Sequence, residues 1–207
     1  MNLSETLWKN NYDLALKSLN TNFVQGIKNG NLPESNFKDY IAQDYYFLES
    51  FAKAYGLAIS KSSNKNHIKV LSQLLIGISE ELFLHEKYAK KLEIDLTIST
   101  IDFSTKKYTD FLANTSKNKS CIEILSAMIP CMRLYAWLGK SLKNKIKNNP
   151  YKDWIITYSD QGFEELAFSL ENLIDNWSDS YNFEQLNSLY QKAMELEADF
   201  FNSYSNF

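Results

Sequence analysis

Asp44 is the first of three reactive side chains that the sequence places among apolar neighbours. On a helical wheel it falls within an aromatic stripe, no more than about 60° from Phe37, Tyr40, Ile41, Leu48, Phe51 and Tyr55. Burial of an ionised carboxylate is costly, so this side chain must be paired, hydrogen-bonded or protonated. The pattern fits either a ligand-binding carboxylate or a buried aspartate bonded to a tyrosine or a backbone amide.

Glu197 occupies an equivalent place near the end of the chain. The wheel surrounds it with Tyr190, Ala193, Met194, Phe200, Phe201 and Tyr204, whereas Glu195 faces the opposite side. Apolar surroundings raise the pKa of a carboxyl group, so Glu197 is predicted to donate a proton near neutral pH. A core ion pair is the alternative interpretation.

Cys131 lies in the stretch AMIPCMRLYAW, directly after a proline in an otherwise helical pattern. A buried cysteine alone is usually an inert small hydrophobe. Pro130, however, leaves the carbonyl of Ser126 without its helical partner, and we expect it to bend the helix and open space. Tyr135 follows one turn later on the same face. Cys121 is about 15 Å away along the helix, so the two thiols are expected to stay separate.

Two further polar residues receive structural interpretations. Arg133, the only arginine, is about 200° from Cys131 on the wheel and is expected to form an ion pair elsewhere, at a subunit contact for example. His85 and Glu81 form an ExxxH pair, which we interpret as a core or interface histidine. With only His67 and His85 available, the sequence predicts no metal site, and no cofactor is expected.

Helices must position these side chains, because a periodicity of about 3.6 residues recurs along the whole chain and no long alternating run is present. The predicted fold class is all-α, in a single domain over residues 1–207. Pro33 is expected at the first helical position of the second helix. The expected helices span roughly residues 3–19, 33–61, 65–92, 105–115, 119–147, 151–158, 160–177 and 183–204.

Charge and composition exclude several classes of partner. The net charge of −3 and the pI of about 5.5 give no basic surface for nucleic acid or an anionic membrane. We find neither a signal sequence nor about 18 uninterrupted apolar residues, so a cytoplasmic protein is expected. The basic segment KSLKNKIKNNPYK is interpreted as a solvated helix end.

Six segments, in order, resemble the TenA family, which is also called thiaminase II or aminopyrimidine aminohydrolase. They are FVQGIKNGNLPESNFKDYIAQDYYFLESFAKAYGLAI, ISEELFLHEKYAKKLEI, KKYTDFL, IPCMRLYAWLG, YKDWIITYSDQGFEEL and ELEADFF. The resemblance covers essentially the whole chain. It implies the heme-oxygenase-like helical bundle, usually assembled as a homotetramer.

The resemblance also implies roles for individual residues. The cysteine after the proline, here Cys131, would be the nucleophile, and Glu197 would be the acid/base group. Asp44 of the QDY motif would bind the aminopyrimidine. The family's tyrosines match Tyr108, Tyr135 and Tyr158, which we expect to be the donors that help the thiolate form. Phe47 stands where the family often has tyrosine, so it can stack on a pyrimidine but lacks a hydroxyl, and FF at residues 200–201 replaces the usual FW.

The implied reaction is hydrolysis of 4-amino-5-aminomethyl-2-methylpyrimidine, a breakdown product of thiamin, to ammonia and the hydroxymethylpyrimidine that thiamin synthesis reuses. The resemblance leaves open that thiamin itself is cleaved to pyrimidine and thiazole. Two alternatives remain at this point. One is a noncatalytic pyrimidine-binding or regulatory protein on the same fold, and the other is a metal-dependent oxidase on a related bundle.

Overall fold

The computed structural model describes residues 2–94 and 100–206, without the side chains of residues 84, 87, 88 and 91. Helices account for every regular element in these ranges, which confirms the all-α prediction. The elements are α1 (Leu3–Asn10), α2 (Tyr12–Leu19), α3 (Asn22–Asn29), α4 (Glu34–Lys61), α5 (Lys65–Lys91), α6 (Phe103–Asn118), α7 (Cys121–Leu142), η1 (Lys143–Lys145), α8 (Lys152–Ser159), α9 (Gln161–Asp175) and α10 (Phe183–Ser203).

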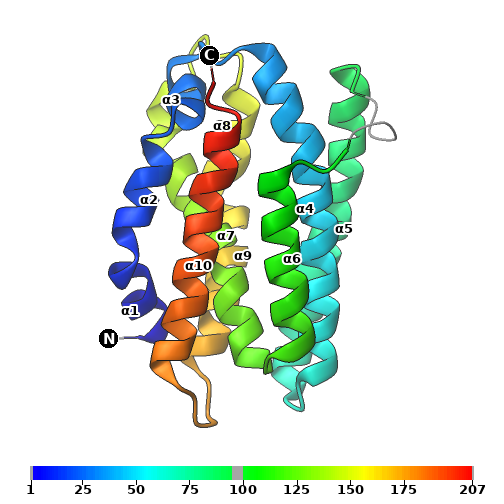
Figure 1. Cartoon of the computed structure of the whole chain (residues 1–207), viewed down its shortest axis with the longest axis vertical. Helices are drawn as coiled ribbons and strands as arrows, with labels where there is room; N and C mark the ends of the chain where they lie inside the picture. Colours follow the sequence, from blue (N-terminus) through cyan, green and yellow to red (C-terminus); the bar gives the residue numbers. More distant parts are fainter. Residues whose placement is uncertain (1, 95–99, 207) are drawn as a thin grey trace.

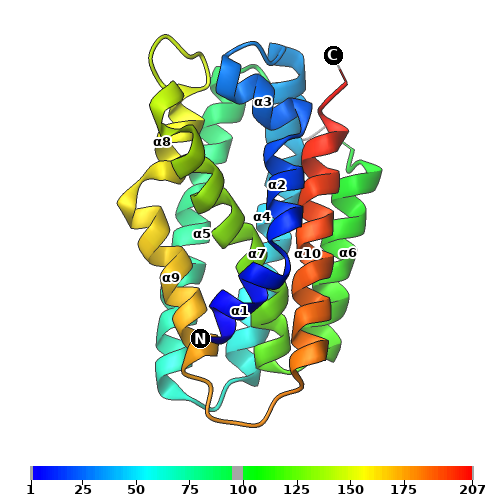
Figure 2. The same ribbon diagram turned by 90° about the vertical axis from the view of Figure 1, so that its left-hand side faces the viewer.

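The long helices run side by side in one elongated bundle (Figure 1). Helix α4 packs between α5 and α6, and α7 packs against α8, α9 and α10. The short helices α1, α2 and α3 follow one another along the outside of α10, as the view in Figure 2 shows. This arrangement brings the predicted reactive residues of α4, α7 and α10 toward one interior.

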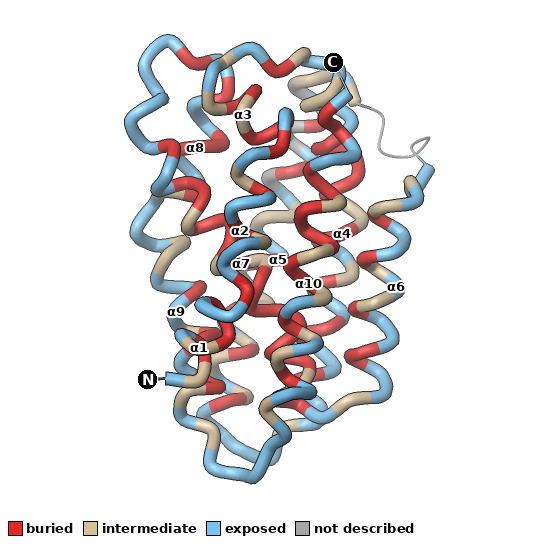
Figure 3. The backbone as a smooth tube through the Cα atoms, turned by 60° about the vertical axis from the view of Figure 1, so that its left-hand side comes forward, coloured by how far each residue is buried: buried red, intermediate tan, exposed pale blue. Residues whose placement is uncertain are grey.

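Helix α7 is the central helix of the bundle. Its segment Cys121–Lys145 is long and apolar enough to span a membrane by composition, with mean hydropathy 1.4, but 78% of the tested window is buried inside the protein. Buried residues run along its whole length, and in Figure 3 the buried positions of neighbouring helices face inward toward one another. A helix that is apolar all round is expected in the middle of such a bundle.

The N-terminal part of the chain differs from the sequence prediction. The expected single helix over residues 3–19 is two helices, because the chain breaks at Asn11, whose side chain donates to the carbonyl of Leu7 at 2.8 Å. Helix α3 was not predicted at all. Thr21 caps its first turn by accepting from the backbone of Val24, and Gly30 ends it in the left-handed conformation at φ 70°.

Three later expectations can be compared with the structure. Pro33 is the N-cap of α4 and not its first helical residue, so that prediction was wrong by one position. The predicted helix over 119–147 ends as α7 at Leu142, followed by one 3₁₀ turn. Pro130 lies inside α7 as expected, and the bend that we attribute to it stays a prediction.

Gly139 lets α8 approach α7 closely. A Cβ atom at this position would overlap the backbone carbonyl of Tyr158 and lie 2.6 Å from the amide nitrogen of Ser159. Only glycine therefore permits this crossing. The crossing fixes where α8 carries Tyr158 relative to the face of α7 that holds Cys131.

Candidate active site

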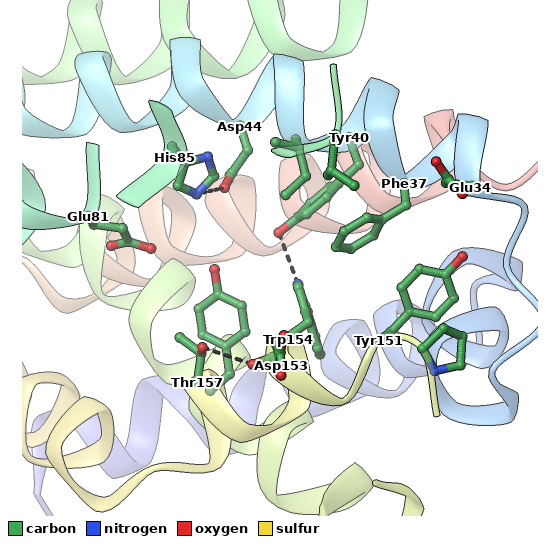
Figure 4. A pocket seen from close by; sticks show the side chains of 14 residues that line it. Glu34, Phe37, Tyr40, Asp44, Glu81, His85, Tyr151, Asp153, Trp154 and Thr157 are labelled. Atoms are coloured by element: carbon green, nitrogen blue, oxygen red, sulfur yellow. Dashed lines mark hydrogen bonds and ion pairs between the residues drawn. The ribbon is translucent and has the colours of Figure 1, made fainter. Parts of the chain in front are cut away.

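Two adjacent hollows open between α4, α5, α7 and α8, and Asp44, Glu81 and Tyr158 border both of them. The inner pocket has a volume of about 20 Å³. Its lining is Asp44, Phe47, Leu48, Phe51, Ile78, Glu81, Cys131, Met132, Tyr135, Tyr158 and Phe163. The outer chamber has about 250 Å³ and is drawn in Figure 4. Its lining is Glu34, Phe37, Tyr40, Ile41, Asp44, Glu81, His85, Leu92, Pro150, Tyr151, Asp153, Trp154, Thr157 and Tyr158.

Glu197 on α10 lies beside Cys131 on α7, as expected for two residues on helix faces that turn toward the interior. The Glu197 side chain is 1% exposed. It accepts a hydrogen bond of 2.8 Å from the Tyr108 hydroxyl. Burial raises the pKa of Glu197 to about 7, although the interactions with Tyr108 and with the nearby Cys131 thiol oppose the rise. This carboxyl group can therefore both take and give a proton near neutral pH.

The surroundings of Cys131 favour the thiol over the thiolate. Burial raises the pKa of Cys131 well above its ordinary value, and the nearby carboxylates Glu197, Asp44 and Glu81 raise it further. A thiolate therefore has to form at the moment of attack, by transfer of its proton to a neighbour. Glu197 is the first of the nearby carboxyl groups that could accept that proton.

The hydroxyl groups of Tyr108 and Tyr135 have partners other than the Cys131 thiol. The Tyr108 hydroxyl donates to Glu197, and the Tyr135 hydroxyl is 3.3 Å from that of Tyr40. Tyr40 in turn accepts from the indole nitrogen of Trp154 at 3.3 Å. The Tyr108 hydroxyl thus donates to Glu197 and not to Cys131, because a wheel shows which way a residue faces and not which partner its hydroxyl meets. Help from Tyr135 and Tyr158 in forming the thiolate stays a prediction.

Asp44 has a partner that sequence reasoning did not give it. Its Oδ2 lies 3.2 Å from Nε2 of His85, a contact that Figure 4 marks with a dashed line. Burial raises the pKa of Asp44 well above its ordinary value, helped by the charges of Glu81 and Glu197, and burial lowers the pKa of His85 to about 4. Both directions disfavour charge, so the pair is held uncharged with a proton between the two groups.

The remaining predicted residues line the inner pocket or support it. Phe47 is 5% exposed and packs on Tyr108, with 4.7 Å between ring centroids. Tyr158 borders both hollows and packs edge-on against Tyr135 at 4.7 Å. The structure thus brings all seven predicted site residues into one region, where Tyr108 and Glu197 lie behind the pocket lining.

Glu81 and His85 are the site residues that sequence reasoning set aside. Their ExxxH spacing on α5 predicts a core or interface histidine, because two ligands of different type do not make a metal site. The missing information was that α5 packs against α4 and turns this face toward Asp44. Within the described ranges, no three His, Cys, Asp or Glu side chains are grouped in a way that could hold a metal ion.

Arg133 points away from the thiol, as predicted. Its Nη1 lies 3.3 Å from Oε2 of Glu171, and its guanidinium lies over the rings of Trp8 and Phe168 at 5.2 and 5.7 Å. The expected ion pair is confirmed and forms within the chain. This residue has no contact with the site.

Comparisons with known proteins show which family the chain belongs to. The chain is 27% identical to the aminopyrimidine aminohydrolase of Halalkalibacterium halodurans, over 100% of this chain and 96% of that protein. It is 34% identical to the bifunctional TH2 protein, mitochondrial, of Arabidopsis thaliana, over 91% of this chain. The chain spans about a third of the length of that plant protein, of which 35% is matched.

Solved structures share the fold. The TenA homologue protein from P. horikoshii OT3 superposes with a TM-score of 0.92 at 24% identity, over 99% of this chain and 98% of that one. Heme oxygenase-1 from the cyanobacterium Synechocystis sp. PCC6803 superposes with a TM-score of 0.67 at 12% identity, over 98% and 92% of the two chains. The heme-oxygenase-like bundle is therefore confirmed. The profile of the TENA/THI-4/PQQC family matches residues 8–206, and the chain belongs to this family.

Proposed function

We propose that this protein is an aminopyrimidine aminohydrolase of the thiaminase II type, which releases ammonia from 4-amino-5-aminomethyl-2-methylpyrimidine and returns the hydroxymethylpyrimidine to thiamin synthesis. One observation carries the proposal. The Cys131 thiol lies close enough to the Glu197 carboxyl group for each to shift the pKa of the other, and the pKa of Glu197, about 7, suits proton transfer in both directions. The curated relative from H. halodurans, matched along its whole length, bears this activity as its name.

Asp44 offers the complement of an aminopyrimidine edge. A ring nitrogen next to an exocyclic amine presents one acceptor and one donor. An uncharged carboxyl group presents one donor and one acceptor, and the raised pKa of Asp44 favours that form. His85 fixes one Asp44 oxygen at 3.2 Å. In this proposal Asp44 binds and orients the ring, and Phe47 and Tyr158 hold its plane.

Covalent addition would make the aminomethyl group a better leaving group. Cys131 Sγ bonds to a ring carbon, its proton passes to Glu197, and Asp44 gives its proton to the ring nitrogen. The C–N bond at the 5-methylene then breaks, and the departing amine takes the proton from Glu197 and leaves as ammonia. Water adds to the methylene and loses a proton to Glu197. Finally the S–C bond breaks, the sulfur recovers that proton, and the ring proton returns to Asp44.

The volume of the inner pocket bears on this mechanism. About 20 Å³ holds a water molecule but no ring. Binding of the pyrimidine next to Cys131 therefore requires that lining side chains rotate. Met132 is the most adaptable of them, because its thioether side chain has three rotatable bonds. A shift in substrate binding without loss of fold is the expected result of Met132→Leu.

Cys131→Ala is the decisive variant, and Cys121→Ala is its matched control. Cys121 lies on the same helix, is buried, and donates only to the carbonyl of Ala58. The expected result is loss of amine release in the first variant, with hydroxymethylpyrimidine binding retained, and full activity in the second. Ammonia and pyrimidine product are measured together by a coupled assay and chromatography. Unchanged amine release by Cys131→Ala would refute the nucleophile assignment.

We further propose a single domain over residues 1–207, cytoplasmic, that assembles as a homotetramer. Ile76 and Phe83 support the assembly, since they are 60% and 66% exposed and lie seven residues apart on the outer face of α5. Analytical ultracentrifugation of the wild type and Phe83→Glu tests this proposal. A wild type that sediments as a monomer at micromolar concentration would contradict it.

A further inference from the structure

Glu81 differs from the other carboxyl groups of the site because no described residue forms a hydrogen bond or ion pair with its side chain. It lies on α5 at the boundary between the inner pocket and the outer chamber. Asp44 contacts His85, and Glu197 contacts Tyr108. Among the described residues, no hydrogen bond or ion pair involves the Glu81 side chain, and in Figure 4 its carboxyl group points into the open chamber.

A half-buried, unpartnered carboxyl group costs free energy unless something pairs with it. Burial raises the pKa of Glu81 to about 7. A positive charge beside it would lower that pKa and stabilise the carboxylate. The described lining of both hollows includes neither lysine nor arginine, so no described side chain of the lining supplies such a charge.

The rest of the outer chamber also suits a cation. Aromatic rings of Tyr40, Trp154 and Tyr158 line the same chamber as Glu81, and an aromatic wall attracts a positive charge. Glu34 and Tyr151 lie at the far end in Figure 4, where Glu34 is paired with Lys38 at 2.9 Å. The volume of about 250 Å³ leaves room for an aromatic ring and not only for an amine.

We propose that the outer chamber is the subsite for the leaving group, and that it receives a positively charged nitrogen carried on the 5-methylene, with Glu81 as its counter-ion. The inference rests on the proposed function, because it takes the pyrimidine to lie beyond Asp44 on the Cys131 side. A thiazolium ring carries this charge and leaves as a neutral thiazole, so its departure needs no proton from Glu197. The size of the chamber favours the ring, so substrates as large as thiamin are accepted.

A pair of isosteric probes tests the charge requirement. These are 4-amino-2-methylpyrimidine with a pyridinium-1-ylmethyl group at position 5, and the same compound with a benzyl group, which differ only in one charged nitrogen. Their dissociation constants are measured by calorimetry with the wild type and with three variants. Glu81→Gln removes the charge, Glu81→Asp keeps it, and Glu80→Gln is the matched control on the exposed neighbour of Glu81.

We expect the pyridinium probe to bind about tenfold tighter than the benzyl probe to the wild type and to Glu80→Gln, which corresponds to about 1.4 kcal/mol. The ratio falls to about twofold or less in Glu81→Gln, and Glu81→Asp restores most of it. Equal affinities of the two probes for the wild type, or an unchanged ratio in Glu81→Gln, would overturn the inference.

Two added measurements test the size of the leaving group and distinguish failure of this inference from failure of the proposed function. Turnover of thiamin by the wild type supports the ring-sized leaving group, and turnover of only the aminomethylpyrimidine overturns that part. If hydroxymethylpyrimidine fails to bind and no ammonia is released, the proposed function itself fails. If both occur but the probe ratio is one, only the leaving-group subsite is refuted.

Discussion

Replacement of Glu197 by glutamine should stabilise the protein at alkaline pH. The pKa of this carboxyl group is about 7 in the folded protein, against an ordinary 4.5. Between these values the folded state keeps a proton that the unfolded state has lost, so stability falls as pH rises through this window. Glutamine has nearly the same shape and does not titrate, so the variant escapes this cost.

The size of the effect follows from the two pKa values. At 1.36 kcal/mol for each pKa unit, Glu197 destabilises the fold by about 1 kcal/mol at pH 5 and about 3 kcal/mol at pH 8. The advantage of Glu197→Gln over the wild type should therefore grow by about 2 kcal/mol between these pH values. For a chain of this length this corresponds to about 4–8 °C in Tm. Asp44 adds to the stabilisation in the same direction. The charge of Glu197 contributes to the raised pKa of Asp44, so Glu197→Gln lowers that pKa as well.

Thermal and urea unfolding at pH 5 and pH 8 measure the effect directly. Any hydrogen bond that the glutamine fails to make changes the free energy of unfolding equally at both pH values. Only the change in the stability difference between pH 5 and pH 8 is therefore diagnostic. Glu195→Gln is the matched control, since Glu195 lies on the same helix but its side chain is 38% exposed and contacts Lys192 and Gln191. An equal stability difference at both pH values for Glu197→Gln would refute the conclusion that this carboxyl group is buried uncharged.

Two other substitutions test how the site is built. Tyr108→Phe removes a hydrogen bond that lowers the pKa of Glu197, so the acid limb of the kcat/KM profile should move to higher pH, and a limb that stays in place would contradict this coupling. Gly139→Ala should cost about 1–3 kcal/mol in urea unfolding, because its Cβ overlaps the carbonyl of Tyr158. Gly77→Ala, whose Cβ meets no atom within 4 Å, should be neutral or slightly stabilising, and similar losses in both variants would exclude steric overlap as the cause.

Most of the helices could be predicted because the amphipathic period is local information. The helices from α4 onward begin and end within a few residues of their predicted limits. The errors fall where a helix is too short for its amphipathic period to be recognised. A break at Asn11 depends on a side chain that bonds back to Leu7, and α3 is a single eight-residue helix between a threonine cap and a glycine stop. Such short signals are easily assigned to turns.

The sequence also distinguished interior from exterior polar residues on one helix. Glu197 is buried while the Glu195 side chain is 38% exposed, and Arg133 points away from Cys131, as the wheel predicted. The catalytic and binding roles stay predictions. The wheel indicated Glu197 as a proton donor and Asp44 as a candidate ligand-binding carboxylate, and the resemblance to a family added the nucleophile role of Cys131. The experiments above test them.

The sequence alone determined the fold class and the inward direction of Asp44, Cys131 and Glu197, because both follow from residue spacing within single helices. Only the tertiary structure decided what these groups meet. Glu197 bonds Tyr108 from 89 residues away, and α5 brings His85 to Asp44 and places Glu81 between the two hollows, where no described side chain pairs with it. These contacts depend on which helices pack together, and they set the directions of the pKa shifts, which no single helix encodes.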